Sequence, residues 1–385
     1  MEFFKTSNIK FMKYKYLAFV LSGIVIALGI ISYISKDGFI YGIDFSGGTL
    51  VELAFKEDTT VADIRSKLAK VGLGDSLIQR FGERNEFLIK TQRISEKKFE
   101  EERMEDHERM AKLIVDIMRT EKEEQELKKG KIDLNNSNEI RIAKIVENYL
   151  NDRKRASEIA KKIIEYRNGR MGLITNYDEL YNLRLDGKIV EGIKKDSFLG
   201  SFTTLGVEIV GPQIGKDLRK KATLAIIWAL LGMLVYIALR FKIQYGIAGV
   251  ITLFHDTLVT LAFISFFNKE ISLNVVAALL TIVGYSINDT IVIFDRVRDN
   301  LKSMKKHNFE EILNNSINQT LSRTIITSGV VFVTVVILYL FGGEIINGFA
   351  FTMIVGVITG SYSTIYQSCS IVYLWEKYLR KKRFK

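Results

Sequence analysis

Long apolar blocks separated by charged segments limit the fold of this 385-residue chain more than any other feature of its sequence. Hydrophobic residues make up 48% of the chain, but their clustering, rather than this average, decides the class. A helix needs about 20 mostly apolar residues to cross a bilayer. The blocks near or above this length predict six transmembrane helices, at residues 16–35, 222–239, 245–267, 271–294, 324–340 and 346–375.

The first block could be a signal peptide, since lysines precede it, but its apolar core exceeds the roughly 7–15 residues expected of one and no A-x-A cleavage site follows. We therefore expect a retained anchor. If all six blocks span the membrane, the lysines and arginines of the short loops fall on one side, which is normally the cytoplasmic side. This pattern predicts a multi-pass protein of the inner (plasma) membrane with both termini in the cytoplasm. It also explains the net charge of +11 without nucleic-acid binding.

The chain divides into four parts on this reading. We expect a cytoplasmic N-terminus and first helix over 1–36, an external domain over 37–220, helices two to six over 221–376 and a basic cytoplasmic tail over 377–385. Within the external domain, strand patterns at 41–55, 77–81, 86–91 and 202–210, with helical spacing at 60–72, predict a small α+β domain with an antiparallel sheet.

A charged segment at 93–195 interrupts this domain, and its apolar residues recur at the spacing of amphipathic helices. The part at 172–183 has a faint helix-hairpin-helix character that would suggest nucleic acid, but an external location argues against that partner. We interpret the segment as a helical insertion of unassigned role.

A glycine-rich turn follows the first helix, in the sequence GIDFSGGT. Glycine permits backbone angles or close approaches that a Cβ would obstruct. No lysine follows in the spacing of a phosphate-binding loop, so a tight turn is the simpler interpretation. Its candidate structural residues are Gly42, Asp44, Gly47 and Gly48.

The fourth apolar block carries Asn288 and Asp289 inside it. An ionised carboxylate in hydrocarbon is costly, so it requires a partner, a wet cavity or a bound proton. At about 1.5 Å per residue, Asp289 lies about 22 Å from the external end of its helix, in the cytoplasmic third of the bilayer. Asp295 lies at the boundary, where water reaches it. Asp289, with Asn288 beside it, is therefore the leading candidate for ion coupling.

Arg323 opens the fifth apolar block at a comparable depth, so we expect it to be the partner of Asp289. Two interpretations are open. The pair is either a static ion pair that fixes helix packing, or a switch in which protonation of Asp289 releases Arg323 and lets the helices shift.

Polar residues occur in two other apolar blocks. His255 and Asp256 either extend an ion route or simply satisfy each other. The small residues Gly356 and Gly360 predict a close helix contact, and the polar run at 361–370 either packs or lines a wet crevice, with packing favoured. Three histidines and one cysteine, Cys369, are scattered without ligand spacing, so we expect no metal, cofactor or enzymatic activity.

The segments GIDFSGGT at 42–49, NDTIVIFDRVRDN at 288–300 and NQTLSRTIITS at 318–328, together with the order of the six helices, resemble the SecF family of protein-export membrane subunits, within the RND superfamily. The resemblance covers roughly residues 1–91 and 197–380. It implies an RND-type membrane bundle, a ferredoxin-like external domain, and a role with SecD and the SecYEG channel in late export driven by the proton or sodium motive force. The family's intramembrane aspartate and arginine fall on Asp289 and Arg323. The segment 93–195 departs from the family pattern.

Emerging secreted polypeptides are then the expected substrate of the external domain. Two alternatives from other classes are an RND-type exporter of small molecules or lipids and a membrane scaffold whose insertion recruits envelope proteins. The exporter would require a substrate cavity and usually a fused second half, and neither is visible in the sequence.

Overall fold

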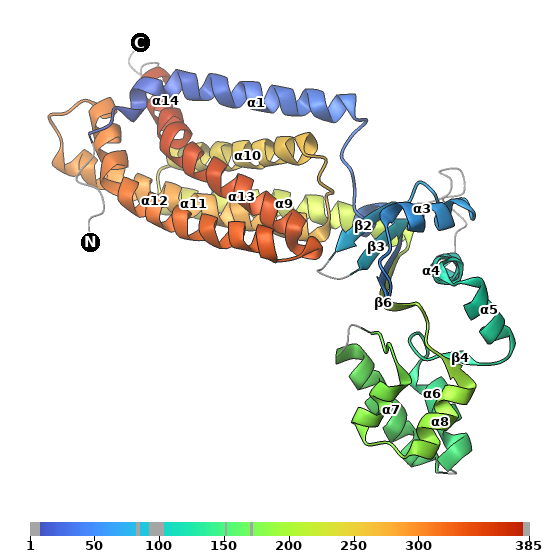
Figure 1. The fold of residues 1–385 in the computed structure, drawn as a ribbon. Coiled ribbons are helices and arrows are strands. Elements are labelled where there is room, and N and C mark those ends of the chain that lie inside the picture. The colour runs from blue at the N-terminus through green and yellow to red at the C-terminus, as the bar shows by residue number, and fades with distance from the viewer. Residues whose placement is uncertain (1–7, 82–84, 92–103, 151, 170–171, 380–385) are drawn as a thin grey trace. The chain divides into compact units, whose positions relative to one another are not determined.

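The computed structural model describes residues 8–81, 85–91, 104–150, 152–169 and 172–379, which form two compact units (Figure 1). A membrane unit contains residues 1–45 and 217–385, and a sheet unit contains residues 46–216. These boundaries lie at 46 and 217, whereas the sequence suggested 37 and 220, because the segment before residue 46 packs on the membrane helices through the buried side chain of Phe45. The start of the expected insertion, at 93–103, and most of the basic tail lie outside the described residues.

Six helices among the described residues are long and apolar enough to cross a membrane, which confirms the six predicted spans. The sixth span is continuous through α13, a π-helical segment η4, and α14. The helices of this unit are α1 Lys15–Ser35, α2 Ile43–Ser46, α9 Pro212–Arg240, α10 Ile243–Phe266, α11 Leu273–Ser303, α12 Phe309–Phe341, α13 Glu344–Ser363, η4 Thr364–Ser368 and α14 Cys369–Leu379, preceded by the short 3-10 helix η1 Phe11–Tyr14.

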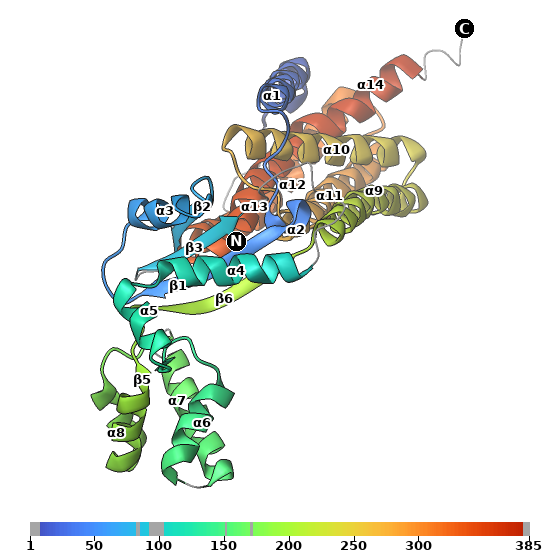
Figure 2. The same ribbon diagram turned by 90° about the vertical axis from the view of Figure 1, so that its right-hand side faces the viewer.

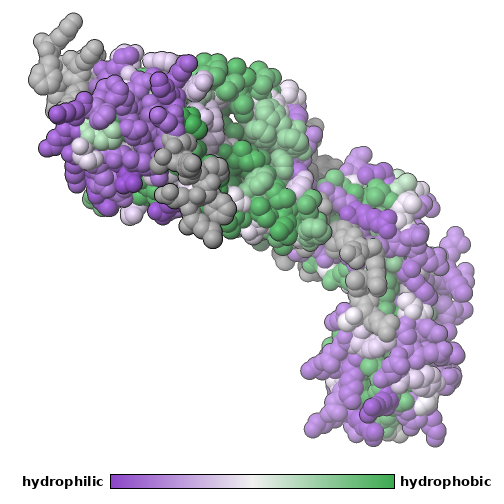
Figure 3. Space-filling model, turned by 60° about the vertical axis from the view of Figure 1, so that its left-hand side comes forward, coloured by the Kyte–Doolittle hydropathy of each residue, from purple (hydrophilic) through white to green (hydrophobic). Residues whose placement is uncertain are grey.

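Burial separates the inner helices of the membrane unit from the outer ones. More than half of the apolar windows of α10, α11 and the sixth span is buried, whereas α1, α9 and α12 expose most of theirs. Figure 3 shows the resulting broad hydrophobic surface. Polar side chains on the inward faces of α10, α11 and α13 are therefore enclosed by protein.

Two helices extend well past their apolar blocks. The fourth block was expected to end at residue 294, but α11 continues to Ser303, and α12 begins at Phe309 rather than at residue 324. The polar first turns of α12 are held as a helix by an N-cap, where Asn308 Oδ1 accepts a hydrogen bond from Glu311 N. Arg323 thus lies in the middle of α12 instead of opening it.

The sheet unit has the predicted α+β fold, with strands β1 Gly48–Phe55, β2 Leu77–Phe81, β3 Glu86–Thr91 and β6 Phe202–Val210 and helices α3 Val61–Ala69 and α4 Met104–Met118. All pairings in its four-stranded sheet are antiparallel, in the order β2-β3-β1-β6. The order β1-α3-β2-β3-α4-β6 is that of a ferredoxin-like fold. The helices α3 and α4 pack together and share one apolar core with the sheet (Figure 2).

The helix α4 lies inside the segment that the sequence assigned to the insertion. Its apolar face, which includes Ile114 and Met118, is buried in the core of the sheet unit. The high charge of its other face hid this membership in the sequence. The inserted module therefore begins after α4, and its elements are α5 Glu121–Lys128, β4 Ile132–Asp133, α6 Glu139–Leu150, α7 Arg153–Gly169, η3 Tyr177–Leu183, α8 Gly187–Asp196 and β5 Ser197–Phe198.

The inserted module has a hydrophobic core of its own, built mainly from α6, α7 and α8. Buried side chains such as Ile142, Val146, Ile163 and Val190 form it, and β4 pairs in parallel with β5. Figure 2 shows these three helices gathered together. The amphipathic spacing seen in the sequence thus serves a second packed core rather than a set of solvated helices.

Polar contacts fix the two strands that connect the module to the sheet. Asp133 accepts hydrogen bonds from Arg119 Nη1 (2.7 Å), Asn136 Nδ2 (2.8 Å), Asn135 N (3.0 Å) and Gly200 N (3.1 Å). The side chain of Asp133 is 3% exposed. Because a buried carboxylate with several donors is held in one position, Asp133 ties β4 to Arg119 and to Gly200.

Glu123 makes the same junction sensitive to acid. Burial alone would raise the pKa of Glu123, but hydrogen bonds from the backbone of Thr120 and Ser201 outweigh burial and bring this pKa below its ordinary value of 4.5. A depressed folded-state pKa gives stability that is complete above the unfolded value and is lost as the pH falls through the folded value. In the whole chain, we expect hydrogen exchange near Ser201 to speed up below about pH 4.5. The Glu123→Gln variant will exchange faster at neutral pH and respond less to acid; equal acid profiles for the two chains would contradict this role.

Candidate functional site: a polar network inside the membrane unit

Asp289 lies on α11 and faces the interior of the membrane unit, with 3% of its surface exposed. Its Oδ2 accepts a hydrogen bond from Ser328 Oγ of α12 (3.3 Å), and Ser328 in turn accepts one from Ser361 Oγ of α13 (2.8 Å). The predicted intramembrane carboxylate therefore connects three helices. Such a group is costly to bury unless it is hydrogen-bonded or protonated.

Arg323 does not form an ion pair with Asp289 in this conformation. In the described chain, the two side chains are farther apart than the 4.0 Å limit for a salt bridge, and Arg323 is exposed on α12. It lies one turn from Thr327, whose hydroxyl donates to the Arg323 carbonyl (2.9 Å). The charge of Arg323 nevertheless acts on Asp289 through space. The two groups thus lie on adjacent helices without a direct ion pair.

The other two candidates on α11 are placed differently from Asp289. Asn288 is exposed on the outer face of the helix, because consecutive helical residues point about 100° apart. Asp295 lies near the loop end of α11 and contacts Arg240 Nη2 (3.4 Å) and Arg298 Nη2 (3.5 Å). Its surroundings are those of an ordinary half-exposed ion pair. Asp289 alone among these three is enclosed.

His255 and Asp256 lie together on α10, and both are buried. Asp256 Oδ1 is 3.0 Å from His255 Nδ1, while Asp256 Oδ2 accepts hydrogen bonds from Ser286 Oγ (2.6 Å) and Ser363 Oγ (2.9 Å). The pair satisfies itself, as one interpretation of the sequence held, but it is also bonded to α11 and α13. A second buried carboxylate therefore exists beside Asp289.

The polar run of the sixth span joins these two carboxylates. Ser361 reaches Ser328, Ser363 reaches Asp256, and Thr364 Oγ1 is 3.0 Å from Thr290 Oγ1 of α11. This contact falls at η4, a π-helical segment, and such segments are common at functional sites. The sequence left two interpretations of this run, a wet crevice or hydrogen bonds to neighbours, with packing favoured, and in the structure its hydroxyls form hydrogen bonds between helices.

Close packing of α13 on α11 brings these hydroxyls within reach of their partners. A Cβ at Gly356 would lie 2.1 Å from Ile282 Cδ1, and one at Gly360 would lie 3.2 Å from Ser286 Cβ. The small residues predicted as a contact thus face the helix that carries Asp289. A Cβ at Gly356 would clash with Ile282, and one at Gly360 would require Ser286 to shift by a few tenths of an ångström, so the close approach of the two helices depends on these glycines.

Replacing Gly356 by valine tests this contact. We expect a loss of about 1–3 kcal/mol of stability, because an inserted side chain forces α13 away from Ile282. Gly284→Val on α11 is the matched control, since a Cβ there meets nothing within 4 Å. Thermal unfolding of the detergent-solubilised chain measures both variants. Equal midpoints for the two would contradict the packing role of Gly356.

The glycine-rich turn divides at the boundary between the two units. In the membrane unit, Gly42 N donates to Ile271 O (2.9 Å), and Asp44 Oδ2 accepts from Leu273 N (2.8 Å) at the start of α11. In the sheet unit, Gly47 and Gly48 have positive φ angles of 74° and 143° where β1 begins. The turn therefore attaches the chain to α11 before it enters the sheet.

Two asparagines that sequence reasoning did not single out hold the N-terminal segment on α12. Asn318 Oδ1 accepts from Ile9 N (3.0 Å) and its Nδ2 donates to Ile9 O (2.8 Å), while Asn314 Oδ1 accepts from Met12 N (2.9 Å). Asn318 begins the NQT sequence of the fifth helix, which was the available signal. These amides position a segment rather than a reacting group.

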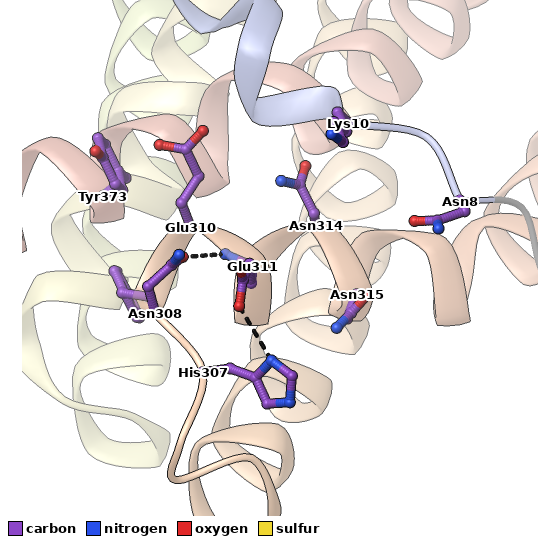
Figure 4. A pocket seen from close by; sticks show the side chains of 10 residues that line it. Asn8, Lys10, His307, Asn308, Glu310, Glu311, Asn314, Asn315 and Tyr373 are labelled. Atoms are coloured by element: carbon purple, nitrogen blue, oxygen red, sulfur yellow. Dashed lines mark hydrogen bonds and ion pairs between the residues drawn. The ribbon is translucent and has the colours of Figure 1, made fainter.

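A polar pocket of about 710 Å³ lies between this N-terminal segment, the start of α12 and Tyr373 (Figure 4). Its acidic groups are partnered, since Glu311 is bonded to His307 (3.0 Å) and Glu310 faces Lys15 Nζ (3.4 Å). Among the described residues, no group of three or more histidine, cysteine, aspartate or glutamate side chains is placed to hold a metal ion. The enclosed polar groups of the membrane unit thus remain the candidate site.

The chain is similar to known proteins in sequence and in fold. The model for the C-terminal region of the protein export membrane proteins SecD/SecF matches residues 190–378, and the model for the SecD/SecF GG motif matches residues 33–59. Together they cover more than half of the chain. The protein translocase subunit SecF of Koribacter versatilis is 39% identical over 95% of this chain and 91% of its own length.

The chain belongs to the SecF family. SecF of Calditerrivibrio nitroreducens is 35% identical over 98% of this chain and 96% of its own length. The crystal structure of SecDF, a translocon-associated membrane protein from Thermus, superposes with a TM-score of 0.63 at 26% identity; the match covers 96% of this chain and 39% of that longer chain. As a SecF translocase subunit, the protein is a multi-pass transport protein and not an enzyme.

Proposed function

We propose that this SecF subunit couples the proton or sodium motive force to late steps of protein export, through Asp289 and Arg323. The observation that supports this role is the enclosed carboxylate of Asp289, bonded by the neutral hydroxyl of Ser328 and near the charge of Arg323. A buried carboxylate without a direct counter-ion changes its interactions strongly when it binds a cation. Binding of a proton or Na⁺ there would alter the contact between α11 and α12.

Membership in the SecD/SecF family implies SecD as a partner. The exposed apolar surfaces of α1, α9 and α12 offer a surface for a second membrane half, since the SecDF chain from Thermus is more than twice as long as the matched region. We further propose that the SecYEG channel and emerging polypeptides are the other partners, with the sheet unit outside the inner membrane and both termini in the cytoplasm. The clustering of short-loop lysines and arginines supports this orientation.

Reconstituted export tests the proposal. Vesicles would contain SecYEG, SecD and either this chain or no SecF, and would receive an imposed pH gradient or an imposed Na⁺ gradient. We expect one gradient to accelerate completion of export only when this chain is present, and that gradient identifies the coupling ion. Equal rates with and without the chain under both gradients would overturn the proposed coupling.

A further inference from the structure

The hydrogen bonds around His255 fix which of its ring nitrogens carries the proton. Gln367 Nε2, on η4, lies 3.0 Å from His255 Nε2 and can only donate. His255 Nε2 therefore accepts, and the proton of the neutral ring is on Nδ1, which donates to Asp256 Oδ1 (3.0 Å). The structure thus describes the neutral Nδ1–H form of His255, enclosed between an amide and a carboxylate.

The same amide begins a directional chain of hydrogen bonds that ends on α1. Gln367 Nε2 also donates to Ser22 Oγ of α1. Tyr362 uses its single proton to donate to the Ala18 carbonyl (2.8 Å), so the contact between Ser22 and Tyr362 (3.2 Å) has Ser22 as donor. Each hydroxyl in this chain can point in only one direction while Gln367 keeps its present orientation.

These bonds hold the part of α1 around Ala18 and Ser22. Most of the apolar window of α1 is exposed. Its other polar contacts lie near its two ends, where Lys15 Nζ meets Glu310 (3.4 Å), Ser32 meets Ser265 (2.8 Å) and Lys36 Nζ donates to Ser265 O (2.7 Å). After α1, the chain continues through the glycine-rich turn into β1 of the sheet unit. In the sequence, only the segment with the glycine-rich turn thus separates α1 from the sheet unit.

We infer that Gln367 is a positioning residue that couples protonation of His255 to the attachment of α1. A proton from water that binds His255 Nε2 turns it into a donor facing the NH₂ group of Gln367. The carboxamide must then rotate by half a turn so that Oε1 accepts. In one outcome, Ser22 Oγ loses the hydrogen bond that Gln367 Nε2 donated to it. In the other, the Ser22 hydroxyl turns to donate to Gln367 Oε1, and Tyr362 loses the hydrogen bond that Ser22 donated to it. Either rearrangement removes one hydrogen bond between α1 and the sixth span.

The groups around His255 permit this exchange. Asp256 balances the imidazolium charge directly. The ring centroid of Tyr362 on α13 lies 6.4 Å from that of His255, and Asp289 of α11 lies one turn beyond Ser286, which donates to Asp256. The α1 helix contributes hydroxyl and carbonyl groups at this level. The π-helical turn of η4, where the backbone is already off the regular α pattern, is a suitable place for a side chain to change partner.

A first experiment reads the protonation of His255 directly. The chain has three histidines, so ¹⁵N-histidine NMR of the whole protein in lipid vesicles, with His255→Asn for assignment, isolates the signal. We expect the Nδ1–H form at neutral pH and a doubly protonated ring at acid pH. Gln367→Met removes the amide, and the tautomer preference should weaken in this variant. An Nε2–H ring in the unmodified protein would overturn the inference.

A second experiment measures α1 itself. Cysteines at Ser32 and Ser265 report contact between α1 and α10 by their rate of disulfide formation. A neutral hydrogen bond contributes about 0.5–1.5 kcal/mol. We therefore divide the rate of disulfide formation at acid pH by the rate at neutral pH, and expect this ratio to be roughly two- to tenfold lower in the protein with Gln367 than in the Gln367→Met variant. Dividing the acid-to-neutral rate ratio of the protein with Gln367 by that of the Gln367→Met variant removes the effect of thiol ionisation. Thr290→Val, which loses another bond to η4, should keep the response of the unmodified protein.

The inference deepens the proposed function and rests on it, because the proposed coupling supplies the proton that reaches His255. The contact of α1 can nevertheless be measured without export. Asp289→Asn is expected to keep the pH response of α1, even where it stops gradient-driven export. If export fails to depend on Asp289 while α1 still responds through Gln367, the proposed coupling is wrong and the relay stands. Equal acid-to-neutral ratios with and without Gln367, or an acid response that persists in His255→Asn, would overturn the relay.

Discussion

Asp289→Asn will abolish the response of export to the coupling gradient while leaving the membrane unit folded. Asparagine has nearly the same shape and still accepts from Ser328, but it neither binds a proton nor carries the negative charge that attracts Na⁺. Moving one elementary charge through 100 mV supplies about 2.3 kcal/mol, which corresponds to a factor of roughly 50 in rate or equilibrium. Loss of one coupled charge at that potential would therefore reduce gradient-driven export by up to about this factor.

The measurement is the rate of export into vesicles with and without the imposed gradient. Asp295→Asn is the matched control, since this aspartate lies six residues from Asp289 on the same helix but contacts Arg240 and Arg298 near the loop end. It should keep the gradient response. Arg323→Leu should lose the response, and Arg323→Lys should keep part of it, because a lysine retains the charge. A full response in Asp289→Asn would exclude this carboxylate as the coupling group.

Local sequence patterns were sufficient to predict much of the fold. The strands β2, β3 and β6 have the bounds that their β-branched and apolar runs predicted, and α3 begins after Thr60, whose hydroxyl and the carboxylate of Asp63 form a capping box. The six spans followed from hydropathy in the same way. Each of these features depends on residues close together in the sequence, which is why one chain was enough to find them.

The ends of α11 and α12 and the membership of α4 could not be read in this way. Hydropathy detects where a helix is apolar, whereas α12 continues through polar turns held by the Asn308 cap. The strongly charged α4 shows only a narrow apolar face, and its burial against the sheet depends on strands distant in the sequence. In both cases tertiary packing, rather than local preference, sets the result.

The sequence singled out Asp289, the main carboxylate of the candidate site, but not the hydrogen bonds that join this site to other helices. Asp289 was conspicuous because charge is rare in hydrocarbon. Ser328 ends the segment 318–328, and Ser363 and Gln367 belong to the polar run at 361–370, but the sequence did not show which groups they bond. Their partners lie 39, 107 and 112 residues away. The role of a serine or glutamine follows from which helix faces it, and helix pairing carries no signal in a single sequence.

Asp133→Ala will loosen the inserted module from the sheet unit, the second large effect we expect. The substitution removes the acceptor of Arg119, Asn135, Asn136 and Gly200 together and leaves a mostly buried guanidinium without its closest carboxylate. Removing one partner of a buried ion pair typically costs about 3–5 kcal/mol. Hydrogen exchange of the whole chain should therefore accelerate in β4, β5 and the start of β6.

Glu126→Ala is the matched control for this prediction, because Glu126 forms its ion pairs with Lys129 and Lys131 in the same connecting region but at the surface. Surface pairs contribute about 0–1 kcal/mol, so exchange in that variant should stay near that of the unmodified chain. The double variant Arg119→Met with Asp133→Leu separates the charge from the geometry. It should recover only part of the loss, since the backbone NH groups of Asn135 and Gly200 still lack an acceptor. Full recovery of the hydrogen-exchange protection would contradict this expectation. It would mean that the loss in Asp133→Ala comes from the unpaired Arg119 and not from the backbone NH groups that lack an acceptor.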